Sequence, residues 1–156
     1  MNLLNKYIPD YTFNEYHHLY INARQADCFK AAKSIDLSKS GITKFLLILR
    51  GLPTEDLSIS GFLKNMRFTI IEEKLHDEFL IDASQPGIII FWNFHFKSIS
   101  ASKTLVSTET RILCLNKKLK KRFSLYWFFI KPFSGLIRLK MLKLIKKEAE
   151  KIKSIN

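Results

Sequence analysis

Cysteine, glycine and histidine are all scarce in this sequence, and each shortage excludes a kind of site. The two cysteines, Cys28 and Cys114, stand far apart and in no metal-ligand spacing. We expect them to be small buried residues in a reducing compartment rather than ligands or a disulfide. The five glycines form no phosphate-binding loop, and the four histidines have no metal-ligand spacing. We therefore expect no metal site and no cofactor.

Long apolar runs are also missing. The densest apolar stretch, Leu125–Ile130, has six residues, whereas a membrane-spanning helix needs roughly 18–20. Residues 1–11 lack the charged start and the apolar run of a signal peptide. We therefore expect a cytoplasmic protein that at most attaches to the inner face of the membrane.

What the sequence does have is positive charge, and it is concentrated at one end. Residues 117–156 carry thirteen Lys or Arg and two Glu, which gives +11 of the chain's net charge of +12. A basic amphipathic helix favours an anionic membrane surface as partner, or its lysines simply keep the helix soluble. Nucleic acid is not expected, because the aromatic residues lie on the expected core face rather than among the lysines. The sequence gives no oligomeric state.

The pattern of apolar residues predicts one domain over residues 1–156. The expected elements, in chain order, are an irregular lead-in (1–14), a strand (15–21), two short helices (25–34 and 38–49), a loop or weak edge strand (54–65), four antiparallel strands (66–74, 78–82, 88–97 and 103–114) and a long helix (116–153). Pro132 should kink the long helix, because its ring lacks an amide and clashes with the preceding turn.

A sheet made of hairpins needs a cover for its apolar face. The terminal helix is the only predicted element that is long enough. The sequence therefore predicts an α+β fold, in which a curved antiparallel sheet wraps around a long C-terminal helix and two short helices follow the first strand.

Three motifs then give a family resemblance. They are Leu46–Pro53, Trp92–Phe94 followed by Ser107–Arg111, and Tyr126–Trp127 followed by Ile130, Pro132, Ser134–Arg138 and Met141–Leu142. The chain resembles an uncharacterised bacterial branch of the START-like (SRPBCC) superfamily of helix-grip proteins over about Tyr16 to Ile152. The resemblance implies a hydrophobic cavity between sheet and terminal helix that carries lipids, sterols or polyketides. Relatives have a longer insert where Ala83–Gly87 joins two strands here, and the size of the cavity depends on this connection.

Alternation along the central hairpin separates two faces. With a turn centred on Ser100, Trp92 would lie opposite Thr108, and Phe94 and Thr110 would share their face. The resemblance implies that these four side chains line the ligand cavity, whereas the pattern alone is equally typical of an ordinary core.

The other face of the hairpin carries Asn93, His95, Glu109 and Arg111. A register slip of one residue would bring Glu109 and Arg111 to the cavity wall instead. Because antiparallel sheets often show one face to water, this polar face is expected to be exposed. No acid–base pair of His95 and Glu109 is assigned.

The terminal helix supplies the remaining candidates. Tyr126 and Trp127 share one helical face and are expected to contact the ligand. Arg138 projects inside the apolar arc of the second half, where an unpaired charge would be costly. Its partner is either a carboxylate, with Glu109 and Glu148 as candidates, or the polar head of a ligand. Alternatively, it reaches water along its aliphatic stem.

The predicted function is binding or transport of a small hydrophobic molecule, lipid-like or polyketide-like, between the sheet and the terminal helix. The ligand-binding residues are expected to be Trp92, Phe94, Thr108, Thr110, Tyr126, Trp127 and Arg138. Peripheral binding to an anionic membrane is the alternative. No catalytic residue is assigned, so a lipid- or polyketide-modifying enzyme rests on the resemblance alone.

Overall fold

The computed structural model describes residues 2–49, 51–52 and 54–155. Met1 and Asn156 of the expected domain, and Arg50 and Pro53 of the first motif, lie outside the described residues. The elements in chain order are α1 (Leu3–Tyr7), β1 (Phe13–Ile21), α2 (Gln25–Ser34), the 3-10 turn η1 (Leu37–Lys39), α3 (Gly41–Leu49), α4 (Ile59–Met66), β2 (Thr69–Lys74), β3 (Glu78–Asp82), β4 (Ile88–Ser100), β5 (Lys103–Cys114) and α5 (Lys117–Ile155).

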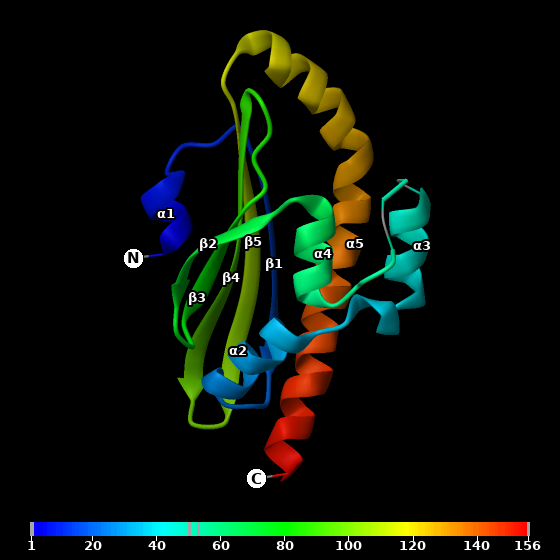
Figure 1. Ribbon diagram of the computed structural model, residues 1–156. Coiled ribbons are helices and arrows are strands. Elements are labelled where there is room, and N and C mark those ends of the chain that lie inside the picture. The colour runs from blue at the N-terminus through cyan, green and yellow to red at the C-terminus, as the bar shows by residue number, and fades with distance from the viewer. Residues whose placement is uncertain (1, 50, 53, 156) are drawn as a thin grey trace.

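The strands form one antiparallel sheet in the order β1-β5-β4-β3-β2. The helices α2, α4 and α5 lie on one side of this sheet, and α1 lies on the other (Figure 1). Contacts of α5 with β1, β5 and α2 place the long helix directly against the sheet and the first inserted helix. The predicted α+β architecture, a curved sheet with a long C-terminal helix, is confirmed.

The register of the central hairpin differs from the prediction by two residues. Trp92 lies opposite Thr110, and Phe94 lies opposite Thr108, because the turn is centred one residue later than expected. A shift of two residues leaves every side chain on its face. The predicted wall therefore keeps its members, although each has a different neighbour.

The helix α5 continues through Pro132 without a break. Its first half curves over the end of the sheet (Figure 1), as expected for a helix that contains a proline. In the second half, the buried face consists of Ile137, Met141, Leu142, Ile145 and Ala149. This face joins the main core, so the second half of the helix anchors the first half to the sheet.

The expectation of an irregular lead-in was wrong at α1. The side chain of Asn2 accepts the amide of Leu4 and caps the helix, and Leu3 and Leu4 are buried. Burial of these two leucines against the sheet stabilises a helix that is too short to form on its own. No pattern in residues 1–14 indicates that contact.

The expectation of a loop or edge strand over residues 54–65 was also wrong, because Ile59–Met66 form α4. The hydroxyl of Ser58 accepts the amide of Gly61 and caps this helix. Ile59, Phe62 and Leu63 are buried at helical spacing. The following strand consequently begins at Thr69, three residues later than expected.

Both cysteines are free thiols; Cys28 on α2 is buried and Cys114 at the end of β5 is half-buried. Burial raises the pKa of the Cys28 thiol from its ordinary value of 9.0 to about 11. Folded protein therefore keeps this proton at a pH where the unfolded chain has released it. Below pH 9 both states are protonated, so the stabilising effect is fully present there and is lost as the pH rises.

We expect the free energy of unfolding to fall between about pH 9 and pH 11, and part of this fall to be missing in Cys28→Ala. Tyrosine and lysine side chains titrate in the same range in both proteins, so the difference between the two curves isolates the thiol. Urea unfolding of both proteins across this range measures it. Parallel curves would contradict the prediction.

Candidate ligand-binding site

A cavity of about 700 Å³ lies between the sheet, α4 and the first half of α5. The sheet side contributes Ala83, Gln85, Ile88, Ile90, Trp92, Thr110 and Ile112. The facing side of α5 contributes Leu119, Arg122, Phe123, Tyr126, Trp127, Ile130, Ser134, Ile137 and Arg138. Leu47 and Leu52 from the α3 region, and Phe62, Asn65, Met66, Arg67 and Phe68 from α4 and its end, complete the lining. The volume lies in the range of about 300–1,000 Å³ that is typical of small-molecule sites.

Five of the seven residues expected to contact a ligand lie in this lining, namely Trp92, Thr110, Tyr126, Trp127 and Arg138. The short connection through Ala83–Gly87 therefore leaves room for a cavity. The structure does not place Phe94 and Thr108 at the cavity, although they share the expected face of the hairpin.

Phe94 and Thr108 belong to the solid part of the core. The ring of Phe94 packs between those of Phe79 and Trp92, with centroid distances of 5.1 and 5.0 Å. The hydroxyl of Thr108 accepts the indole N–H of Trp92 at 2.6 Å and donates to the carbonyl of Asn93 at 2.8 Å. Phe29 of α2 fills this end of the sheet through ring contacts with Phe79. The cavity is therefore confined to the opposite end.

Trp92 and Arg138 form the centre of the site. The guanidinium carbon of Arg138 lies 3.5 Å from the centroid of the Trp92 ring. Trp92 is 1% exposed, and its hydrogen bond to Thr108 fixes the orientation of the indole. A fixed indole face is a favourable cation–π platform for a guanidinium. It holds the Arg138 head in the wall of the cavity.

The two carboxylates considered as partners of Arg138 are engaged elsewhere. Glu109 accepts from Nε of Arg111 at 2.8 Å on the other face of the sheet. Glu148 pairs with Lys39 at 3.4 Å and with Lys151 at 3.2 Å, and the two lysines hold the pKa of its carboxyl below the usual value. The sequence identified Arg138 as unusual but missed its stacking on Trp92.

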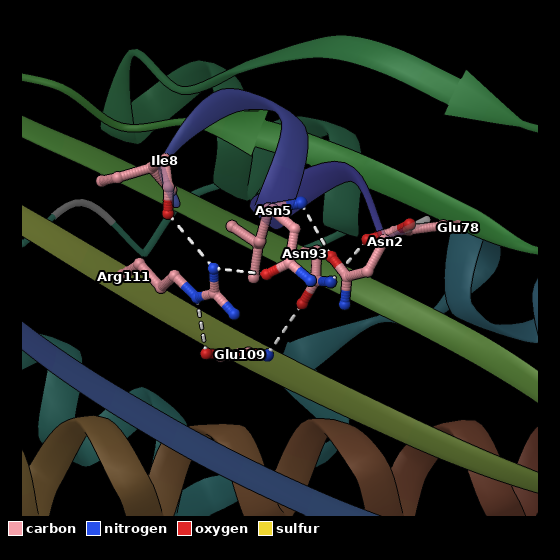
Figure 2. A network of polar contacts seen from close by, with 8 residues as sticks. Asn2, Asn5, Ile8, Glu78, Asn93, Glu109 and Arg111 are labelled. Atoms are coloured by element: carbon pink, nitrogen blue, oxygen red, sulfur yellow. Dashed lines mark hydrogen bonds and ion pairs between the residues drawn. The ribbon is translucent and has the colours of Figure 1, made fainter. Parts of the chain in front are cut away.

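The opposite face of the sheet was expected to be exposed, and this was wrong beneath α1 (Figure 2). Glu78 is completely buried there. One of its oxygens accepts the amide of Leu3 at 2.8 Å, and the other accepts the side-chain amide of Asn93 at 2.6 Å. The short helix thus covers polar side chains and satisfies them.

Arg111 ties the end of α1 into the same network (Figure 2). Its guanidinium donates to the side-chain oxygen of Asn5 at 2.8 Å and to the carbonyl of Ile8 at 3.1 Å. Glu109 therefore has Arg111 as its partner, while His95 lies 3.7 Å from Asp77. His95 and Glu109 therefore have separate partners in the described part of the chain.

The wall formed by α4 was missed by the sequence analysis. Phe62, Met66 and Phe68 face the cavity from this helix and its end. The signal that could have found them is the Ser58 cap followed by apolar residues at helical spacing. The acids and serines before the helix obscured this signal.

The described part of the chain has neither a metal-binding cluster nor a helix able to span a membrane. Within residues 2–49, 51–52 and 54–155, no cluster of three or more His, Cys, Asp or Glu side chains is arranged to hold a metal ion. In the same part of the chain, no helix combines the length and the apolar character that crossing a membrane requires.

Several solved structures share the arrangement of sheet and helix. A conserved protein from Geobacillus kaustophilus superimposes with a TM-score of 0.52 at 11% identity, over 89% of this chain and 96% of that chain. A norcoclaurine synthase point mutant from Thalictrum flavum, in complex with a transition-state analogue, gives 0.50 at 11% identity over 90% and 96%. A START superfamily protein from Mycobacterium smegmatis gives 0.44 at 7% identity over 89% of this chain and 98% of that chain.

No family model matches the chain, and no curated protein matches it either. At identities this low, the first two structures show the fold alone.

Proposed function

We propose that this chain, which shares its fold with the Geobacillus kaustophilus protein and the norcoclaurine synthase mutant, binds a small hydrophobic molecule between its sheet and α5. The observation that carries the proposal is the cavity of about 700 Å³ with its largely apolar lining. A protein of the same fold, the norcoclaurine synthase mutant, holds a small transition-state analogue. That complex supports a small-molecule site in this fold.

The charges in the cavity favour an anionic or strongly polar head group. The described lining residues include three arginines, Arg67, Arg122 and Arg138, and no Asp or Glu. Arg138 is the one that stacks on Trp92, so its position is the best defined. A guanidinium with planar geometry binds a carboxylate through two parallel hydrogen bonds. A carboxylic acid with an apolar body, such as a fatty acid or an acidic polyketide, therefore fits this site.

The sheet register gives the direction in which such a molecule lies. The Trp92–Thr110 pair is followed by the Ile90–Ile112 pair and then by Ile88. The latter two rows are aliphatic and lead away from Arg138. Leu119, at the start of α5, reaches Gly87 at the far end. We infer that the head group contacts Arg138 and that the apolar body lies along the isoleucine rows.

We propose ligand binding and no chemical reaction. The described lining contains no Asp, Glu, His or Cys, so its side chains offer no ordinary acid–base pair or thiol nucleophile. Binding or transport is accordingly the function that these residues support best, and modification of a lipid or polyketide has no observation in its favour.

Filling the cavity should weaken ligand binding strongly. Thr110 faces the cavity from β5, and in Thr110→Phe the added ring would occupy the space expected for the head group. We expect the affinity for the fluorescent fatty acid cis-parinaric acid to fall at least about tenfold, as steric exclusion from a preformed site predicts. Fluorescence titration of the purified protein, after organic extraction of any bound molecule, measures the effect.

The matched control is Thr69→Phe, which adds the same ring at an exposed position of the edge strand β2. A second variant, Arg138→Met, keeps the cavity open and removes the charge. It should weaken competition by dodecanoate more than competition by dodecanol. Equal affinity of Thr110→Phe and Thr69→Phe for the probe, with both proteins folded, would refute the proposed site.

A further inference from the structure

The outward side of α5 carries apolar side chains that the described residues leave uncovered. Leu125, Phe128, Phe129, Leu136 and Leu139 are between 40% and 74% exposed, and we call them the apolar stripe. At about 100° per residue, they fall in one arc opposite the buried face of the helix. Single exposed apolar residues are ordinary, but a contiguous group of large ones marks an interaction surface.

Basic side chains flank the apolar stripe on the same arc. Lys118 and Lys121 lie on its N-terminal side, and Lys143 and Lys147 lie on its C-terminal side, all of them exposed. No Asp or Glu occurs in α5 before Glu148. The surface is therefore apolar at its centre and positive at both ends.

This combination matches one occupant, the surface of an anionic bilayer. Helices that lie in a bilayer interface bury aromatic and aliphatic side chains at the boundary of head groups and acyl chains, while lysines contact lipid phosphates. The apolar stripe is about 21 Å long at the helical rise per residue. Because the first half of α5 curves over the sheet (Figure 1), the outward side is the convex one.

A groove beside the apolar stripe favours a lipid, rather than another protein, as the binding partner of this surface. A second hollow of about 670 Å³ lies between β1 and α5, where Trp127, Leu136 and Leu139 provide apolar walls and Lys131 lines it as well. Glu15 is the one acidic residue among its described lining residues; its side chain is buried and bonded to His17 at 2.9 Å. An acyl chain with an anionic head group fits such a groove.

A second copy of the chain fits the same surface poorly. Two stripes packed antiparallel would place Lys118 and Lys121 of one copy near Lys143 and Lys147 of the other. Like charges in an interface oppose association. Anionic lipid has the complementary charge at both ends of the stripe.

We propose that α5 docks this protein on anionic membranes, with the apolar stripe in the interface and the flanking lysines on lipid phosphates. The proposal goes beyond the cavity, because the cavity is lined by the opposite side of the same helical segment. Docking would bring the cavity next to a reservoir of hydrophobic molecules. Either proposal can fail without the other.

The test is co-sedimentation of the full chain with vesicles. We expect the protein to bind vesicles that contain about 30% phosphatidylglycerol at least about tenfold more tightly than vesicles of phosphatidylcholine alone. The double variant Phe128→Ser/Phe129→Ser should lose at least about tenfold of this affinity. Lys118→Glu/Lys121→Glu should lose a similar amount, and the loss should shrink at high salt.

The matched control is Leu75→Ser, which removes a 72% exposed leucine from the β2–β3 turn and should leave vesicle binding unchanged. Thr110→Phe should also bind vesicles normally, and the double Phe variant should still bind cis-parinaric acid; these two results separate docking from ligand binding. Binding that ignores phosphatidylglycerol, or survives loss of both phenylalanines, overturns the proposal. So does a dimer in gel filtration that the double Phe variant converts to a monomer.

Discussion

A Trp92→Ala protein is expected to unfold with a free energy about 3–5 kcal/mol below that of the natural protein, the usual cost of deleting a large buried aromatic side chain. Trp92 is packed against Phe94 and bonded to Thr108. Its removal would leave a cavity next to the existing one and would take away the donor that the Thr108 hydroxyl accepts, while the bond of that hydroxyl to the Asn93 carbonyl would remain. It would also remove the face on which Arg138 is stacked. Urea denaturation followed by circular dichroism measures the loss.

Trp127→Ala is the matched control, because it deletes the same side chain from a half-buried position on α5. Its ring lies 5.9 Å from that of Phe123 and 6.4 Å from that of Phe13, in a region open to both hollows. We expect it to cost less than half as much as Trp92→Ala. Equal losses would show that Trp92 is not the centre of the core.

Glu78→Ala should be the most damaging change on the other face of the sheet. It would leave two buried donors without an acceptor, the amide of Leu3 and the side-chain amide of Asn93. An unsatisfied buried donor costs about 1–3 kcal/mol, so the pair predicts a loss of about 2–6 kcal/mol. For a protein of this size, that corresponds to a fall in Tm of roughly 4–24 °C. Differential scanning calorimetry measures it.

The corresponding control is Glu73→Ala on the neighbouring strand β2. Glu73 is paired with Lys33 at 2.6 Å, but both side chains are more than one third exposed, and such surface pairs contribute at most about 1 kcal/mol. Loss of the Glu78 contacts should also release α1, so proteases should cut residues 3–12 faster in Glu78→Ala alone. Similar behaviour of the two variants would contradict the role given to Glu78.

The side of the central hairpin on which each residue lies was predictable from the sequence. The position of the cavity along the hairpin was not. Alternation has a period of two, so the pairing could shift by two residues and Trp92, Phe94, Thr108 and Thr110 still shared a side. Which of them meets the cavity depends on where α2 fills the core. Phe29 of α2 contacts Phe79, and Phe79 contacts Phe94, so aromatic rings fill this end of the core. That packing joins segments distant in sequence, and no local pattern records it.

The burial of the polar face of the sheet could likewise not be predicted from the sequence. Asn93, Glu109 and Arg111 have the composition of an exposed surface. Beneath a five-residue helix, however, Asn93 and Arg111 are buried and Glu109 is half-buried. Helix α1 is held by tertiary contacts rather than by intrinsic propensity. For Arg138, chemistry alone required some partner, but the stacking on Trp92 depends on how α5 is aligned with the sheet.

The tight β3–β4 connection sets an upper length for anything held in an extended form against the sheet. From Trp92 to Ile88 the strand advances by about 13 Å at its usual rise per residue. Beyond that point Gly87 has no side chain, and the space is taken by Leu119. A straight molecule whose head group contacted Arg138 would therefore meet the Leu119 side chain after about 13 Å, and a longer one would have to bend.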